Sequence, residues 1–119
     1  MIYSHQQTPE KWSLKGRNVI DDTYICTDKL GSGGQAKCWY ATDKEHRGVA
    51  VKVFKNYPGG KPFEDEVAIY KFLDLVTQDN AHPNLIKMLN CNSNGLQVFE
   101  ELNYQRACAY IVLEEIPGG

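Results

Sequence analysis

Short apolar runs, separated by glycine, proline and polar residues, define the pattern of this chain. Residues 1–22 are mostly polar, show no clear period and are interpreted as an N-terminal extension. The pattern then changes, because an apolar run begins at Tyr24 and a second spans Cys38–Ala41 on the far side of a glycine cluster. Both runs are rich in strand-forming residues. The sequence therefore predicts two strands joined by a hairpin across Gly31–Gly34.

Three more strands and one helix are predicted further along the chain. The strands are expected at Val49–Phe54, Leu85–Leu89 and Ala109–Leu113, each a short apolar run. Pro62 is well placed to open a helix, because the first helical turn has no internal use for its missing N–H. Apolar residues at helical spacing predict that this helix continues to about Val76.

Two segments between the last predicted strands have less regular patterns. Asn92-Ser93-Asn94-Gly95 is a strong turn signal. The stretch from Leu96 to Ala107 mixes apolar, polar and charged residues and predicts no single element. The pattern as a whole predicts five strands and one main helix, with 119 residues allowing one ordinary domain.

Composition and charge narrow the class of protein. Hydrophobic residues make up 42% of the chain and charged residues 24%, a mixture typical of a soluble globular protein. The formal net charge of -2 provides no broad basic field, so we expect no nonspecific nucleic-acid or membrane binding. No apolar stretch approaches the ~20 residues that cross a bilayer.

The four cysteines are widely scattered, with no C-x-x-C pair, so zinc binding is not expected and no metal site is assigned. They could form two disulfides in a secreted domain. The N-terminus has no basic stretch followed by an apolar run, however, and this favours free thiols in the cytoplasm.

Three features that carry chemistry follow one another: the glycines between two strands, Lys52 in the next strand, and Glu66 on the inward edge of the helix. Each has a purely structural interpretation. The glycines could form an ordinary hairpin turn, Lys52 could extend its ammonium to the surface, and Glu66 could be a helix-surface charge. Their order favours a triphosphate site, because glycines let backbone N–H groups approach phosphates while a glutamate positions the lysine.

Several motifs resemble those of the eukaryotic protein-kinase family, from residue 23 to residue 119. They are the glycine loop Leu30–Cys38, the lysine motif Val49–Lys52, the control-helix segment Phe63–Val67, the loop His82–Ile86, and the last strand and hinge Tyr110–Gly119. The resemblance implies an α+β fold, the kinase N-lobe, with a five-stranded antiparallel sheet and one main helix, αC. Residues 23–119 would form this lobe and end at the interlobe hinge.

The resemblance also implies roles for individual residues. Lys52 would contact the α and β phosphates of ATP and Glu66 would pair with it, so both are assigned as catalytic. The ATP-binding residues implied are Leu30, Gly31, Ser32, Gly33, Gly34, Cys38, Ala50, Lys52, Leu113, Glu114 and Ile116. The chain departs from the family pattern in two places, since Ala36 replaces the third glycine and Cys38 replaces the usual valine. Cys38 is equally explained as a small packed hydrophobe.

The expected function is that of the ATP-binding lobe of a Ser/Thr protein kinase. The given sequence contains no H-R-D-x-x-x-x-N, D-F-G or A-P-E motif, so the chain alone is expected to be inactive, and magnesium is expected only with a kinase C-lobe. That lobe, or another protein, would cover an apolar underside formed by Tyr70, Met88 and Leu113. The alternative is a truncated, non-catalytic kinase-like scaffold or interaction module. A dinucleotide-binding fold is disfavoured, because a strand rather than a helix is predicted after the glycines.

Overall fold

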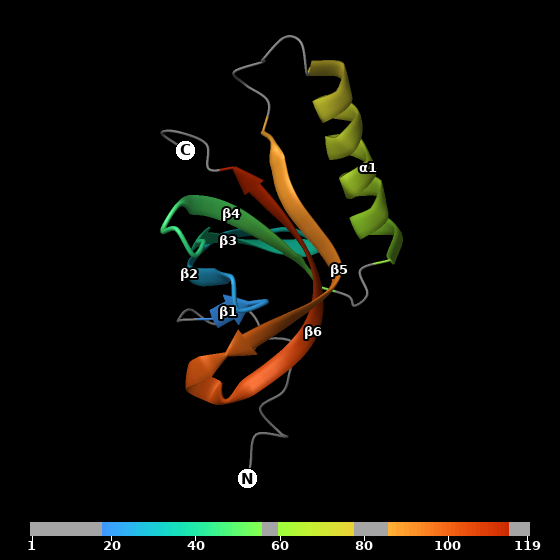
Figure 1. Cartoon of the computed structure of the whole chain (residues 1–119). Helices are drawn as coiled ribbons and strands as arrows, with labels where there is room; N and C mark the ends of the chain where they lie inside the picture. The colour runs from blue at the N-terminus through green and yellow to red at the C-terminus, as the bar shows by residue number, and fades with distance from the viewer. Residues whose placement is uncertain (1–17, 56–59, 78–85, 115–119) are drawn as a thin grey trace.

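Strands account for most of the described chain. The computed structural model describes residues 18–55, 60–77 and 86–114, which form an antiparallel sheet and one helix lying beside it (Figure 1). The elements in chain order are β1 (Asn18–Ile20), β2 (Tyr24–Ser32), β3 (Ala36–Thr42), β4 (Gly48–Phe54), α1 (Gly60–Thr77), β5 (Met88–Phe99), the 3-10 helix η3 (Glu100–Leu102) and β6 (Tyr104–Glu114).

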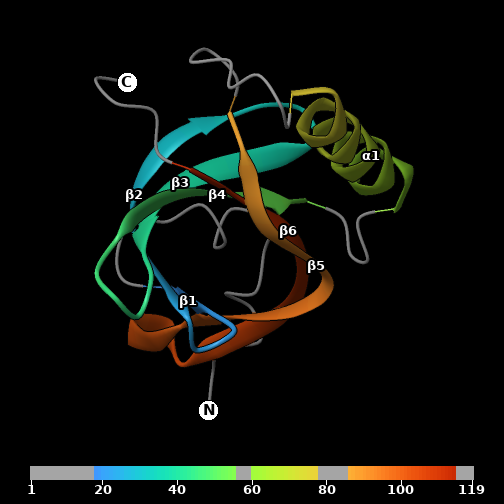
Figure 2. The same ribbon diagram turned by 45° about the horizontal axis from the view of Figure 1, so that its top comes forward.

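The sheet closes on itself. The strand order is β1-β2-β3-β4-β6-β5, and β5 returns to pair with β1. Val19, in the middle of β1, lies opposite Ile25 of β2 on one side and Val98 of β5 on the other. Strand β1 therefore pairs with Tyr24–Cys26 of β2 and with Gln97–Phe99 of β5, two segments that would otherwise be sheet edges. Figure 2 shows the resulting ring of strands, with α1 outside it.

The fold expected from the kinase resemblance is wrong. The chain does not form the five-stranded sheet with αC of a kinase N-lobe, because Asn18–Ile20 adds a sixth strand that closes the sheet into a barrel. This strand lies inside residues 1–22, which the sequence pattern set apart as an extension. All three of its residues are buried, so the short strand is held by its contacts with β2 and β5 rather than by its own pattern.

Strand β5 also differs from its prediction. The strand expected at Leu85–Leu89 instead starts at Met88 and continues to Phe99, and Leu85 lies outside the described residues. The predicted turn at Asn92–Gly95 is wrong, since this segment is an irregularity within the β5–β6 pairing. The carboxylate of Asp21 supports it by accepting hydrogen bonds from Asn92 Nδ2 and from the Leu96 backbone N–H, at 2.9 and 2.8 Å.

Other local predictions are confirmed. Strands β2 and β3 pair across the glycines, with Ser32 opposite Lys37. Strand β4 covers the predicted third strand, and β6 includes the predicted last strand. The predicted helix is α1, which begins two residues before Pro62.

Two apolar clusters hold the structure together. The first fills the barrel and includes Trp39, Val51 and Tyr110. The second lies between the barrel wall and α1, where the rings of Phe54 and Phe63 meet edge to face with centroids 5.5 Å apart. Because side chains alternate along β4, its valines point into the barrel and the residues between them face α1.

Candidate functional site

Lys52 and Glu66 form an ion pair between the barrel and the helix. Lys52 lies between two inward-pointing valines of β4, so its side chain faces α1. Phe63 packs the start of α1 against the barrel and brings Glu66, one turn later, to the lysine. The distance from Lys52 Nζ to Glu66 Oε2 is 2.6 Å, and the two side chains are 28% and 24% exposed. The expected pairing of these two residues is therefore present.

An aromatic ring completes the surroundings of the ammonium group. Lys52 Nζ lies 5.8 Å from the centroid of the Phe54 ring, within the range of a cation–π contact. Phe54 was not among the site residues inferred from sequence. The signal was available, because residues two apart on a strand share a face.

A cavity of about 440 Å³ opens beside this ion pair. Its lining consists of hairpin residues 31–36 together with Cys38, Lys52 and Glu66. The structure thus brings both predicted catalytic residues to the same cavity as Cys38 and the predicted glycine-loop residues 31–34. Gln35 and Ala36 also line it, although sequence reasoning did not select them as site residues. A cavity of this size is in the range of small-molecule sites.

The glycines of the hairpin are not required by the fold. A Cβ added to Gly31, Gly33 or Gly34 would meet no atom within 4 Å, and none of the three has a positive φ. Without side chains at these three positions, the backbone of this part of the cavity lining is left uncovered. The Gly33 N–H is donated to Ala36 O at 2.9 Å, so that particular amide is already engaged.

Cys38 lines the cavity with an uncharged thiol. Burial raises the pKa of its thiol, Lys52 lowers that pKa and Glu66 raises it again. The net shift is upward from 9.0, so the thiol keeps its proton at neutral pH. An apolar, protonated thiol suits packing better than nucleophilic attack.

Among residues 18–55, 60–77 and 86–114, the other predicted ATP-binding residues do not line this cavity. Leu30 is 59% exposed, while Ala50 and Leu113 pack in the cluster beneath α1. Glu114 donates its backbone N–H to Lys87 O at 2.9 Å, so this donor is already used. Ile116 lies outside the described residues.

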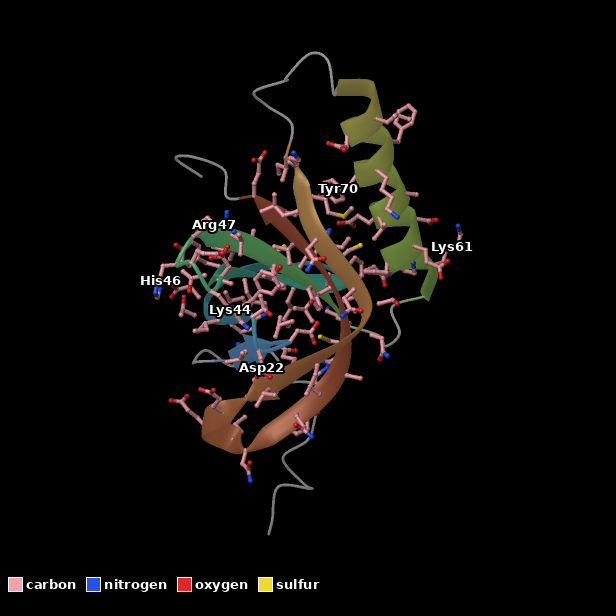
Figure 3. The ribbon with its side chains drawn as sticks, in the orientation of Figure 1. Asp22, Lys44, His46, Arg47, Lys61 and Tyr70 are labelled. Atoms are coloured by element: carbon pink, nitrogen blue, oxygen red, sulfur yellow. The ribbon has the colours of Figure 1, made fainter. Side chains whose placement is uncertain are left out.

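The expected apolar underside is not an exposed patch. Leu113 is buried, and Tyr70 and Met88 are half-buried against the same cluster. Figure 3 shows Tyr70 on the barrel side of α1, whereas Lys61 lies at the outer edge of the helix. Burial and the neighbouring Glu66 carboxylate raise the pKa of the Tyr70 hydroxyl, although Lys52 lowers it. Tyr70 therefore stays a neutral packing residue at physiological pH.

Among the residues that the structure describes, no group of three or more His, Cys, Asp or Glu side chains is arranged to hold a metal ion. In the same part of the chain, no helix has the length and apolar character needed to cross a membrane.

Comparison of the chain with protein-family models and with curated proteins finds no match.

Proposed function

We propose that this chain is the ATP-binding part of a Ser/Thr protein kinase. The observation that carries the proposal is the Lys52–Glu66 ion pair, which faces a cavity whose opposite wall is a hairpin of glycines. A fixed cation beside an open backbone is the chemistry that a triphosphate requires.

Lys52 supplies the charge in this proposal. Its ammonium has three N–H donors, and one is directed to Glu66. In the proposal, the other two donate to phosphate oxygens. Glu66 acts by restricting the rotamers of the lysine, so the donors are oriented before a nucleotide arrives.

The glycine hairpin supplies space. The positions that Cβ atoms would occupy at Gly31, Gly33 and Gly34 are open, so a phosphate can approach the backbone closely there. Backbone dipoles at such a turn favour an anion.

Phosphoryl transfer would use groups outside this site. In the proposal, the Lys52–Glu66 site holds the nucleotide and does not itself supply the catalytic base, the magnesium ligands or the platform for the protein substrate. We place the protein in the cytoplasm, where its four free thiols would stay reduced.

Calorimetric titration with ATP tests the proposal. We expect weak binding that Lys52→Met reduces by roughly tenfold or more, or about 1.4 kcal/mol. Lys71→Met removes an exposed helix lysine and is the matched control, for which no change is expected. Thermal melts establish that both variants fold. Absence of ATP binding by the unmodified chain at millimolar nucleotide, or equal losses in the two variants, would refute the proposal.

A second candidate function is that of an interaction module. The outer face of α1 favours it, because Ile69, Phe72 and Leu75 are 56%, 61% and 66% exposed at a spacing of three residues. Self-association is the first measurement, by sedimentation over a range of concentrations. A concentration-dependent association that Phe72→Glu abolishes, with ATP binding unchanged, would support this candidate. A monomer at every concentration would count against it.

A further inference from the structure

Lysines from neighbouring strands lie together on the face of the glycine hairpin that points away from Lys52. Lys29 of β2 is opposite Trp39 of β3. Lys37 is two residues before Trp39, so its side chain leaves β3 on the same face. Lys29 and Lys37 are therefore diagonal neighbours across the β2–β3 pair.

A third lysine, Lys55, extends this group to the residue that directly follows the next strand, β4. Lys37 lies opposite Val53 of β4, and Lys55 follows Val53 by two residues. The Lys55 N–H donates to Gln35 O at 2.8 Å, so the hairpin and the end of β4 remain joined at this point.

The opposite face carries the cavity beside Lys52 and Glu66. Cys38 and Lys52 are paired across β3 and β4, one residue away from the Lys37–Val53 pair. Since consecutive strand residues alternate between faces, the cavity and the lysine group lie on different sides of the hairpin.

Arg106 adds a fourth cation. Its Nη2 atom donates to Lys55 O at 3.3 Å, which brings the guanidinium beside the end of β4. Lys29 and Lys55 are exposed, and neither forms an ion pair with a carboxylate among residues 18–55, 60–77 and 86–114.

The cations are close enough to affect one another. The pKa of the Lys37 ammonium is lowered by desolvation, then by the charges of Lys29 and Lys55. Like charges held together raise the free energy of the surface, and a bound anion would relieve this repulsion.

We infer that Lys29, Lys37, Lys55 and Arg106 form a docking surface for an acidic peptide segment. Strands β2 and β3 and the end of β4 place the lysines across roughly 10 Å, and alternate side chains of an extended peptide are about 7 Å apart. Carboxylates on such a peptide can therefore meet several of these cations at once.

Charge favours a peptide over a larger polyanion. The whole chain has a formal net charge of -2, whereas stable nucleic-acid binding commonly neutralises about 6–10 phosphates. A local group of four cations fits a short acidic segment better. The inference does not depend on the proposed ATP site, since the two surfaces lie on opposite faces.

Fluorescence anisotropy with a labelled octaglutamate peptide tests the inference. We expect binding at about 50 mM salt that weakens strongly at about 500 mM. Lys29→Glu combined with Lys55→Glu should reduce the affinity roughly tenfold or more. Lys44→Glu combined with Lys71→Glu makes the same change in net charge elsewhere, since Lys44 lies near His46 and Arg47, at the β3–β4 turn (Figure 3). This control should retain the affinity within about twofold.

The other outcomes are also decisive. Absence of peptide binding, or an equal loss in both charge-reversal variants, would overturn the inference. The neutral variant Lys29→Gln with Lys55→Gln should show an intermediate loss, and it replaces the charge reversal if that variant fails to fold. Tighter binding of a DNA duplex or of phosphatidylserine vesicles to the same lysines would overturn the assignment to a peptide. Saturating ATP should leave peptide binding unchanged, and displacement by ATP would contradict two separate surfaces.

Discussion

Lys52 Nζ and Glu66 Oε2 lie 2.6 Å apart, although the two residues are separated by 14 positions in the chain. One belongs to the barrel wall and the other to the helix outside it, so the position of α1 determines how the lysine is held. Partly exposed ion pairs contribute only about 0–1 kcal/mol to stability. The consequence of this pair should therefore appear in ligand binding rather than in folding.

Glu66→Gln tests whether the glutamate acts through the lysine. The amide retains the shape of the side chain but removes its negative charge, so the ion pair becomes a hydrogen bond between an ammonium and a neutral amide oxygen. We expect ATP affinity to fall about threefold to tenfold, because Lys52 is then held less firmly. Calorimetry should show almost no further effect of Glu66→Gln when Lys52→Met is already present. Equal effects in the two backgrounds would mean that Glu66 does not act through Lys52.

Gly33→Ala separates a binding role from a folding role. The added Cβ meets no atom within 4 Å and the residue has no positive φ, so the native structure accommodates it. Loss of backbone freedom in the unfolded chain should leave stability unchanged or raise it by about 0.4–1 kcal/mol. ATP affinity should fall, because the methyl group enters the space at the cavity wall. Urea unfolding and ATP titration are the two measurements, and an unaltered affinity would show that this glycine does not approach the ligand.

The local elements could be predicted from sequence, but barrel closure could not. The hairpin at Gly31–Gly34 and the helix after Pro62 each have a strong local signal, in turn residues and in helical spacing. Strand β1 has none, because Asn18–Ile20 is three residues long and follows a polar segment. Its formation depends on pairing with β5, roughly 80 residues away, and such nonlocal contacts leave no periodic pattern.

The Lys52–Glu66 pairing was also expected from the sequence, whereas the turn at Asn92–Gly95 was predicted wrongly. The order of Lys52 on a strand and Glu66 on the next helix favoured a site that joins them, and the resemblance to kinase motifs implied their pairing. The misjudged turn at Asn92–Gly95 had the usual turn residues, but Asp21 provides partners that keep the segment within the sheet. Side-chain hydrogen bonds from a distant residue thus outweighed local preference.

Gly95→Ala should be destabilising, in contrast to Gly33→Ala. A Cβ at Gly95 would lie 2.5 Å from Cε2 of Tyr110 and 3.2 Å from Oδ2 of Asp21. The Tyr110 hydroxyl donates to the same Asp21 oxygen at 2.5 Å, so the ring cannot move away without losing that bond. We expect a loss of roughly 1–3 kcal/mol in the free energy of unfolding, measured with urea. Stability equal to that of the unmodified chain would contradict the close contact between this glycine and the ring.

Two buried thiols should make the free energy of unfolding decrease as the pH becomes alkaline. Cys26 and Cys108 are fully buried in the barrel, and burial raises the pKa of each from 9.0 to about 12. Between about pH 9 and 12 the unfolded chain releases these protons while the folded chain keeps them. The stabilisation that these two thiols contribute is therefore complete below pH 9. It decreases as the pH rises, by up to about 1.4 kcal/mol per pH unit for each thiol.

Urea unfolding from pH 8 to pH 10, under reducing conditions, measures this effect. The range stops at pH 10 because Tyr110 also has a raised pKa, and its unfolded-state titration is centred there. We expect the free energy of unfolding to decrease by about 2–3 kcal/mol over this range. The double variant Cys26→Ala with Cys108→Ala starts from a lower stability, because the shorter side chains leave cavities, but its dependence on pH should be much flatter. The same slope in both proteins would show that these thiols are not the groups whose protons the fold retains.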